Sequence, residues 1–70
     1  MLTEVATTGE KVKRLRRGKA WTQEQLAEKS RVGQSTVAQI ESGARPNPHP
    51  STLGKLAEAL DVSPAELLED

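Results

Sequence analysis

Residues 22–43 have the sequence TQEQLAEKSRVGQSTVAQIESG, which contains the signals for two short helices separated by a turn. Thr22 and Gln25 have the spacing of a capping box, in which two side chains bond each other's backbone N–H groups at a helix N-terminus. Gly33 is placed to cap a second helix and Gly43 to end it, because glycine readily adopts the left-handed conformation that follows many helices. Two helices joined by only about three residues form a helix-turn-helix pattern.

The apolar positions of this stretch give each helix one face suited to burial. We expect the first helix to end at about Ser30 and the second to cover Gln34–Ser42, with Val37 and Ile40 on its core side. Trp21, directly before the cap of the first helix, is expected to pack in the core. The predicted core residues are Leu26, Val37, Ile40, Leu56 and Leu60.

The residues that precede this stretch predict one more helix. Thr7 and Glu10 have capping-box spacing, and Gly18 is expected to stop the helix. We assign residues 1–8 to a flexible N-terminal segment and residues 9–70 to one helix-turn-helix domain, because 70 residues suffice for a single small core.

The residues that follow predict a connection and two further helices. Three prolines in residues 44–50 favour an extended path, so this segment is expected to be a loop. A fourth helix should begin at Ser51 or Thr52, while Ser63 and Pro64 have the order of a cap and a first-turn proline of a short fifth helix. Since no alternating apolar stretch reaches strand length, the chain is predicted to be an all-α, compact five-helix bundle.

The composition excludes several classes of protein. Without cysteine and with a single histidine, His49, the chain has neither a disulfide framework nor the usual zinc ligands, so we expect no metal and no cofactor. No pair of nucleophile and base and no phosphate-cradling glycine loop indicates an enzyme. No apolar run approaches the roughly 20 residues of a membrane span, which favours a cytoplasmic protein with no membrane partner.

The net charge is zero, but the charges are distributed unevenly along the chain. Residues 11–45 contain nine Lys and Arg against three Glu, a net charge of +6, whereas residues 46–70 have a net charge of −4. The basic part of the molecule therefore has the charge needed to face phosphates, while the acidic part stays in solvent.

The stretch quoted above strongly resembles the Cro and phage-repressor family of transcription regulators, also called XRE-type. The similarity covers roughly residues 9–68, including VKRLRRGKAWTQEQLA before the turn, QSTVAQIESG after it and LGKLAEALDVSPAELL near the C-terminus. It implies a lambda-repressor-like helix-turn-helix domain in which the helix Gln34–Ser42 lies in the major groove of double-stranded DNA.

This resemblance, together with the residue types, predicts the DNA contacts. Gln34, Ser35 and Gln39 occupy the polar face of the recognition helix and are predicted to read bases, because an amide can match N6 and N7 of adenine and serine suits either kind of partner. Gln23 matches a family glutamine that contacts phosphate and braces the first glutamine of the recognition helix. The predicted contacts to the DNA backbone are made by Thr22, Gln23, Ser42, Arg45 and Asn47.

Two structural features follow from the same resemblance. Arg16 and Glu41 match a family ion pair between the first helix and the recognition helix. The turn position usually held by glycine is Arg31, which is expected to take a left-handed conformation at a cost of about 1 kcal/mol.

The function expected from these features is regulation of transcription, by default repression. One short helix specifies few base pairs, so binding to a palindromic operator as a homodimer is expected. Two alternatives remain. The polar residues of the helix could be an ordinary solvated face, or the chain could be an antitoxin-like protein-interaction module that neutralises a partner protein and regulates its own operon.

Overall fold

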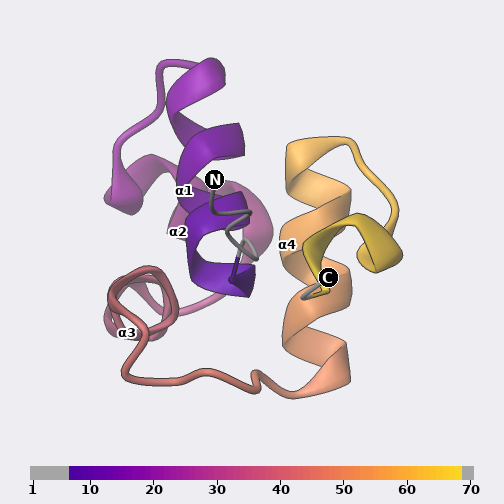
Figure 1. Cartoon of the computed structure of the whole chain (residues 1–70). Helices are drawn as coiled ribbons and strands as arrows, with labels where there is room; N and C mark the ends of the chain where they lie inside the picture. The colour runs from indigo at the N-terminus through magenta and orange to yellow at the C-terminus, as the bar shows by residue number, and fades with distance from the viewer. Residues whose placement is uncertain (1–6, 69–70) are drawn as a thin grey trace, which may run out of the picture.

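The computed structural model describes residues 7–68, which contain four α-helices and one short 3-10 helix (Figure 1). The elements are α1 (Thr8–Gly18), α2 (Gln23–Ser30), α3 (Gln34–Ser42), α4 (Pro50–Leu60) and the 3-10 helix η1 (Pro64–Leu67). No strand occurs within residues 7–68, so the predicted all-α class is confirmed. The predicted count of five helices is wrong, because the fifth element is a single 3-10 turn.

The hydrogen bonds of η1 explain its form. Pro64 lies in the first turn, as predicted, and the Ser63 N–H donates to the Glu66 carboxylate at 3.3 Å. The N–H groups of Glu66 and Leu68 then donate to carbonyl oxygens only three residues earlier, which is the 3-10 pattern. Leu68 is already extended. Four residues are too few to build the ladder of an α-helix.

The starts of α1 and α2 follow the sequence signals. The hydroxyl of Thr7 accepts from Glu10 N–H at 3.1 Å, and that of Thr22 accepts from Gln25 N–H at 3.0 Å, so both predicted capping boxes are present. Thr7 therefore caps α1 and the buried Thr8 begins it, although both were assigned to the flexible N-terminal segment. The remainder of that segment, residues 1–6, and the last two residues of the predicted domain lie outside the described residues.

The start of α4 differs from the prediction. Pro50 is the first helical residue and His49 is the N-cap, with its Nδ1 accepting from the Ser51 N–H at 3.1 Å. Proline suits the first helical position because its missing N–H would have no partner inside the helix. The predicted loop therefore ends one residue earlier, and His49, which had no expected role, caps a helix.

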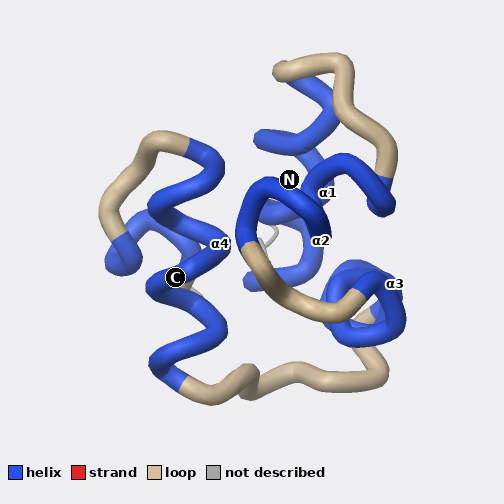
Figure 2. Tube along the Cα trace, turned by 180° about the vertical axis from the view of Figure 1, so that it is seen from behind, coloured by secondary structure: helices blue, strands red, loops and turns tan. Residues whose placement is uncertain are grey.

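The core lies where α1, α2, α3 and α4 meet, and η1 closes it against α4 and α1. Figures 1 and 2 show α3 at one side of the molecule, connected by a long loop to α4 at the other. All five predicted core residues are confirmed, each at most 2% exposed: Leu26, Val37, Ile40, Leu56 and Leu60. Lys11 of α1 also donates to the Leu68 carbonyl, which ties the C-terminal turn to α1. Within residues 7–68 no helix has the length and apolar character to cross a membrane.

Trp21 is less buried than predicted. It packs on the edge of the core and remains half-buried, with the ammonium groups of Lys19 and Lys29 at 5.4 and 5.1 Å from the centre of its ring. Both distances are within the range of a cation–π interaction. The tryptophan therefore lies between the core and two surface lysines, Lys19 before α2 and Lys29 in its last turn.

Candidate nucleic-acid interface

The turn between α2 and α3 consists of residues 31–33 and has the predicted geometry. Arg31 ends α2 in the left-handed conformation, with φ 61°, so the expected departure from glycine is accommodated by backbone strain. Val32 follows it, donates its N–H to the Ala27 carbonyl at 3.1 Å and packs against the core. Gly33 is the N-cap of α3. The turn is therefore anchored at its centre, which fixes the direction in which α3 leaves.

The two faces of α3 have opposite characters. Val37 and Ile40 are buried in the core, whereas Gln34, Ser35 and Gln39 are exposed. The three residues predicted to read bases therefore lie on the solvent side of α3, whose opposite face packs in the core. The arrangement leaves amide and hydroxyl groups available to an external ligand.

The N-terminus of α3 is also open. Gly33 provides no side-chain hydrogen bond and the first turn contains no acidic residue, in contrast to α2, whose cap is Thr22 and whose first turn contains Glu24. The first backbone N–H groups of a helix lack partners inside it and carry partial positive charge. This end of α3 is electrostatically suited to a phosphate group.

A buried polar cluster attaches α3 to α1. Arg16 donates from Nε to Oε2 of Glu41 at 2.7 Å and from Nη2 to Oε1 at 3.0 Å, so the predicted ion pair is present and two-pronged. The third donor of Arg16, Nη1, bonds the Trp21 carbonyl at 2.7 Å. The side chains of Arg16 and Glu41 are only 11% and 2% exposed. No buried side-chain N or O atom among residues 7–68 lacks a partner.

The charges of this cluster stabilise each other. The hydrogen bond with Glu41 raises the pKa of Arg16 despite the opposing effect of burial. Burial would raise the pKa of the Glu41 carboxyl, but the hydrogen bonds from Arg16 and Gln23 and the charges of Arg16 and Lys13 outweigh it, so this pKa is lowered. Glu41 is therefore held as a carboxylate inside the domain.

Gln23 has a different partner from the one predicted. Its Nε2 donates to Oε1 of Glu41 at 3.1 Å, and Gln34, the residue it was expected to brace, is exposed. A carboxylate that is almost fully buried is the stronger acceptor, because hydrogen bonds to charged groups are about twice as strong as those between neutral ones. Gln23 therefore completes the buried cluster, and the position of Gln34 does not depend on it.

Arg45 and Ser42, which are predicted to contact the DNA backbone, both bond to Gln39, which is predicted to read a base. Arg45 donates to Oε1 of Gln39 from Nε at 3.2 Å and from Nη2 at 2.9 Å. Ser42 Oγ donates to the Gln39 carbonyl at 3.1 Å and accepts from the Ala44 N–H at 3.3 Å. Asn47 is exposed farther along the loop. Gln39 is thus the centre of a polar group at the C-terminal end of α3.

Gly9 is a structurally important residue that the sequence analysis did not identify. It is buried where α1 crosses α3, and a Cβ atom at this position would lie 2.2 Å from the Ile40 carbonyl oxygen. The available signal was the glycine itself, because glycine inside a predicted helix is costly and indicates a close approach of another backbone. Gly9 therefore permits the short distance between α1 and α3.

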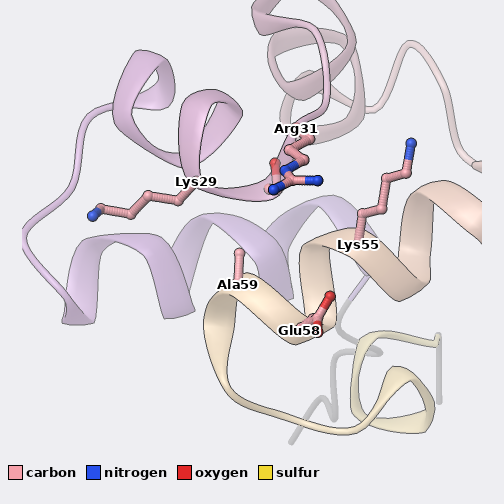
Figure 3. A pocket seen from close by; sticks show the side chains of 6 residues that line it. Lys29, Arg31, Lys55, Glu58 and Ala59 are labelled. Carbon is pink, nitrogen blue, oxygen red and sulfur yellow. The ribbon is translucent and has the colours of Figure 1, made fainter.

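A basic area lies between α2 and α4 and includes Arg31 of the turn that precedes α3. An open hollow of about 490 Å³ is lined by Lys29, Ser30, Arg31, Lys55, Glu58 and Ala59. Figure 3 shows that the ammonium groups of Lys29 and Lys55 point away from each other instead of converging. Elsewhere, no group of three or more His, Cys, Asp or Glu residues in the described part of the chain is arranged to hold a metal ion.

The comparisons with known proteins agree with this geometry. A protein-family model described as "Helix-turn-helix" matches residues 12–67. The HTH-type transcriptional repressor RghR of Bacillus subtilis is 43% identical over 54 residues, which are 77% of this chain and 40% of that protein.

Solved structures are similar over most of the chain. The restriction-modification controller protein C.AhdI from Aeromonas hydrophila superposes with a TM-score of 0.82 at 38% identity, covering 90% of this chain and 94% of that one. The biofilm master regulator SinR, solved in complex with DNA, superposes with a TM-score of 0.84 at 34% identity, covering 87% of this chain and 97% of that one.

This chain spans 39% to 56% of the length of the first three curated relatives it matches. The matched residues 12–67 include the whole of α2, the turn and α3. The chain belongs to the helix-turn-helix family.

Proposed function

We propose that this protein binds double-stranded DNA sequence-specifically through α3 and regulates transcription, most simply as a repressor. The observation that carries the proposal is the exposed polar face of α3, formed by Gln34, Ser35 and Gln39 on a helix whose other face is in the core. A helix of this width fits the major groove, where each base pair presents a distinct pattern of donors and acceptors. The relatives support it, because one is named a repressor and another was solved with DNA.

In this proposal the three exposed polar residues of α3 contact base edges and a second set contacts phosphates. The open N-terminus of α3 favours a phosphate at its first turn. Gln23 contributes mainly by holding Glu41, since its Nε2 is engaged there. The proposed backbone-binding residues are Thr22, Gln23, Ser42, Arg45 and Asn47.

The proposal extends to assembly and location. A homodimer on a palindromic operator is proposed because a single helix of nine residues specifies few base pairs. The protein would work in the cytoplasm, where its DNA ligand is. It would act by binding and not as an enzyme, and its chemistry requires neither a metal nor a cofactor.

Selection of binding sites from random duplexes with the purified protein tests the proposal. Gln34→Ala is expected to relax the preference at one operator position by about 1–3 kcal/mol while barely changing non-specific binding, because a bidentate amide contact discriminates by that amount. Lys55→Ala on α4 is the control and should leave every preference unchanged. If Gln34→Ala weakens all sequences equally, α3 does not read the groove, and the solvated-face or protein-partner alternative takes its place.

A further inference from the structure

The contact between Arg45 and Gln39 is built into the end of α3. Gly43 ends the helix in the left-handed conformation, with φ 88°, and turns the chain back on itself. The Arg45 N–H then donates to the Gln39 carbonyl at 3.1 Å, and Ser42 Oγ bonds both Gln39 and Ala44. These bonds bring the guanidinium of Arg45 beside the side-chain amide of Gln39.

This contact determines how the Gln39 amide is oriented. A guanidinium has five N–H donors and no acceptor, so the amide atom that faces it is Oε1. Nε and Nη2 of Arg45 both donate to this oxygen, at 3.2 and 2.9 Å, and therefore occupy its two lone pairs. Only the Nε2 amino group of Gln39 remains for a base.

A glutamine with an occupied oxygen reads a different base from the one expected from sequence. Adenine presents an N7 acceptor beside an N6 donor, so a bidentate contact needs both the amide nitrogen and the amide oxygen. Guanine presents two acceptors, N7 and O6, which match a group that only donates. An adenine at this position would instead place its N6 donor against the donors of Gln39 and Arg45.

We propose that Arg45 determines specificity, by making Gln39 a donor-only reader of guanine. The inference rests on the proposed function, in which α3 enters the major groove. Three of the five N–H groups of Arg45 are not used by Oε1, so Arg45 also has donors for a phosphate. Arg45 thus acts on the base through Gln39 and on the backbone directly.

The contact is tested first in the DNA-free protein. The Arg45 Nε–H signal in NMR spectra should be shifted and protected from exchange, and Gln39→Ala should return it to the position of a free arginine. Lys55→Ala is the control and should leave the signal unchanged. A signal that does not respond to Gln39→Ala shows that the contact is absent and overturns the inference.

The base preference is then measured with four operators that differ only at the position where Gln39→Ala abolishes selectivity. The wild-type protein is expected to prefer guanine to adenine by roughly 5- to 150-fold, the range of one good contact. Arg45→Ala should lower affinity overall and shift the preference at that position towards adenine, with the Gln34 position unchanged. The inference is overturned if the wild type prefers adenine, or if Arg45→Ala weakens all four operators equally.

Failure of the proposed function has a separate signature. If the NMR contact is present but neither Gln34→Ala nor Gln39→Ala changes selectivity at any position, α3 does not read bases. That result removes the proposed function, and the specificity role of Arg45 with it, although the contact itself stands.

Discussion

Two arginines contact α3, one from each side. Both donate two hydrogen bonds to a side chain of the helix, but one contact is buried and the other is exposed to solvent. Arg16 reaches from α1 to Glu41 on the core side with two hydrogen bonds, and Arg45 reaches from the following loop to Gln39 on the exposed side, also with two. The Glu41 side chain is 2% exposed, whereas Gln39 and Arg45 are both exposed. The two members of a buried pair cannot replace each other by water, so the pair fixes the position of the helix. An exposed pair instead determines which donors and acceptors of the helix remain free for a ligand.

The largest effect is expected from breaking the buried pair. Glu41→Ala should lower the free energy of unfolding by about 3–5 kcal/mol, because Arg16 would keep its desolvation cost without its partner. Chemical denaturation followed by circular dichroism measures this. The double variant Arg16→Met, Glu41→Leu should lose much less, since no unpaired charge remains, and an equal or larger loss would show that the pair's attraction outweighs its desolvation.

A smaller loss is expected where α1 and α3 approach most closely. Gly9→Ala should destabilise the domain by about 1–3 kcal/mol, because its Cβ would overlap the Ile40 carbonyl and force the helices apart. Gly54→Ala, in an open part of α4, is the matched control and should instead stabilise by about 0.5–1 kcal/mol. Thermal unfolding of both variants gives the comparison. If the two changes have the same sign, the close approach does not exist in solution.

Lowering the pH should weaken the contact between Arg16 and Glu41. The loss of unfolding free energy should be smaller than in Glu41→Ala or Gly9→Ala, because a protonated Glu41 keeps its volume and one hydrogen-bond acceptor. The pKa of Glu41 is lowered in the folded state from its ordinary value of 4.5. Its contribution to stability is therefore complete above pH 4.5 and is lost as the pH falls through the lower, folded pKa. As the pH is lowered below 4.5, the free energy of unfolding should fall more steeply for the wild type than for Glu41→Gln. Equal slopes would contradict the lowered pKa.

The smallest effect on stability is expected on the outer side of α3. Arg45→Ala should change the free energy of unfolding by at most about 0.5 kcal/mol, because exposed polar contacts compete with water. The same variant should reduce the salt dependence of DNA binding by about one unit of slope, since one phosphate contact is lost. Lys55→Ala removes the same charge from α4 and should leave that slope unchanged. A large loss of stability in Arg45→Ala would mean that the outer contact also holds the fold.

The sequence predicted those features that depend on neighbouring residues. The capping boxes at Thr7 and Thr22 and the stop at Gly43 involve groups within a few residues of one another, so their spacing is sufficient to place them. The left-handed Arg31 followed instead from the family resemblance. The apolar period likewise placed the core side of α3. The last predicted helix was wrong because its cap signals do not state how many residues follow in helical form.

The family resemblance predicted the Arg16–Glu41 pair, but only the tertiary structure decided which other polar groups meet. Gln23 lies 18 residues from Glu41 in the chain, and its partner was settled by the burial of that carboxylate in the folded domain. Gly9 matters because the Ile40 carbonyl comes so close, and the glycine in α1 signals a close approach without identifying the group that approaches. Arg45 and Gln39 are only six residues apart, yet their contact depends on the direction the chain takes after Gly43. Spacing specifies a helix because its bonds are local, whereas side-chain partners depend on the path of the whole chain and on what that path removes from water.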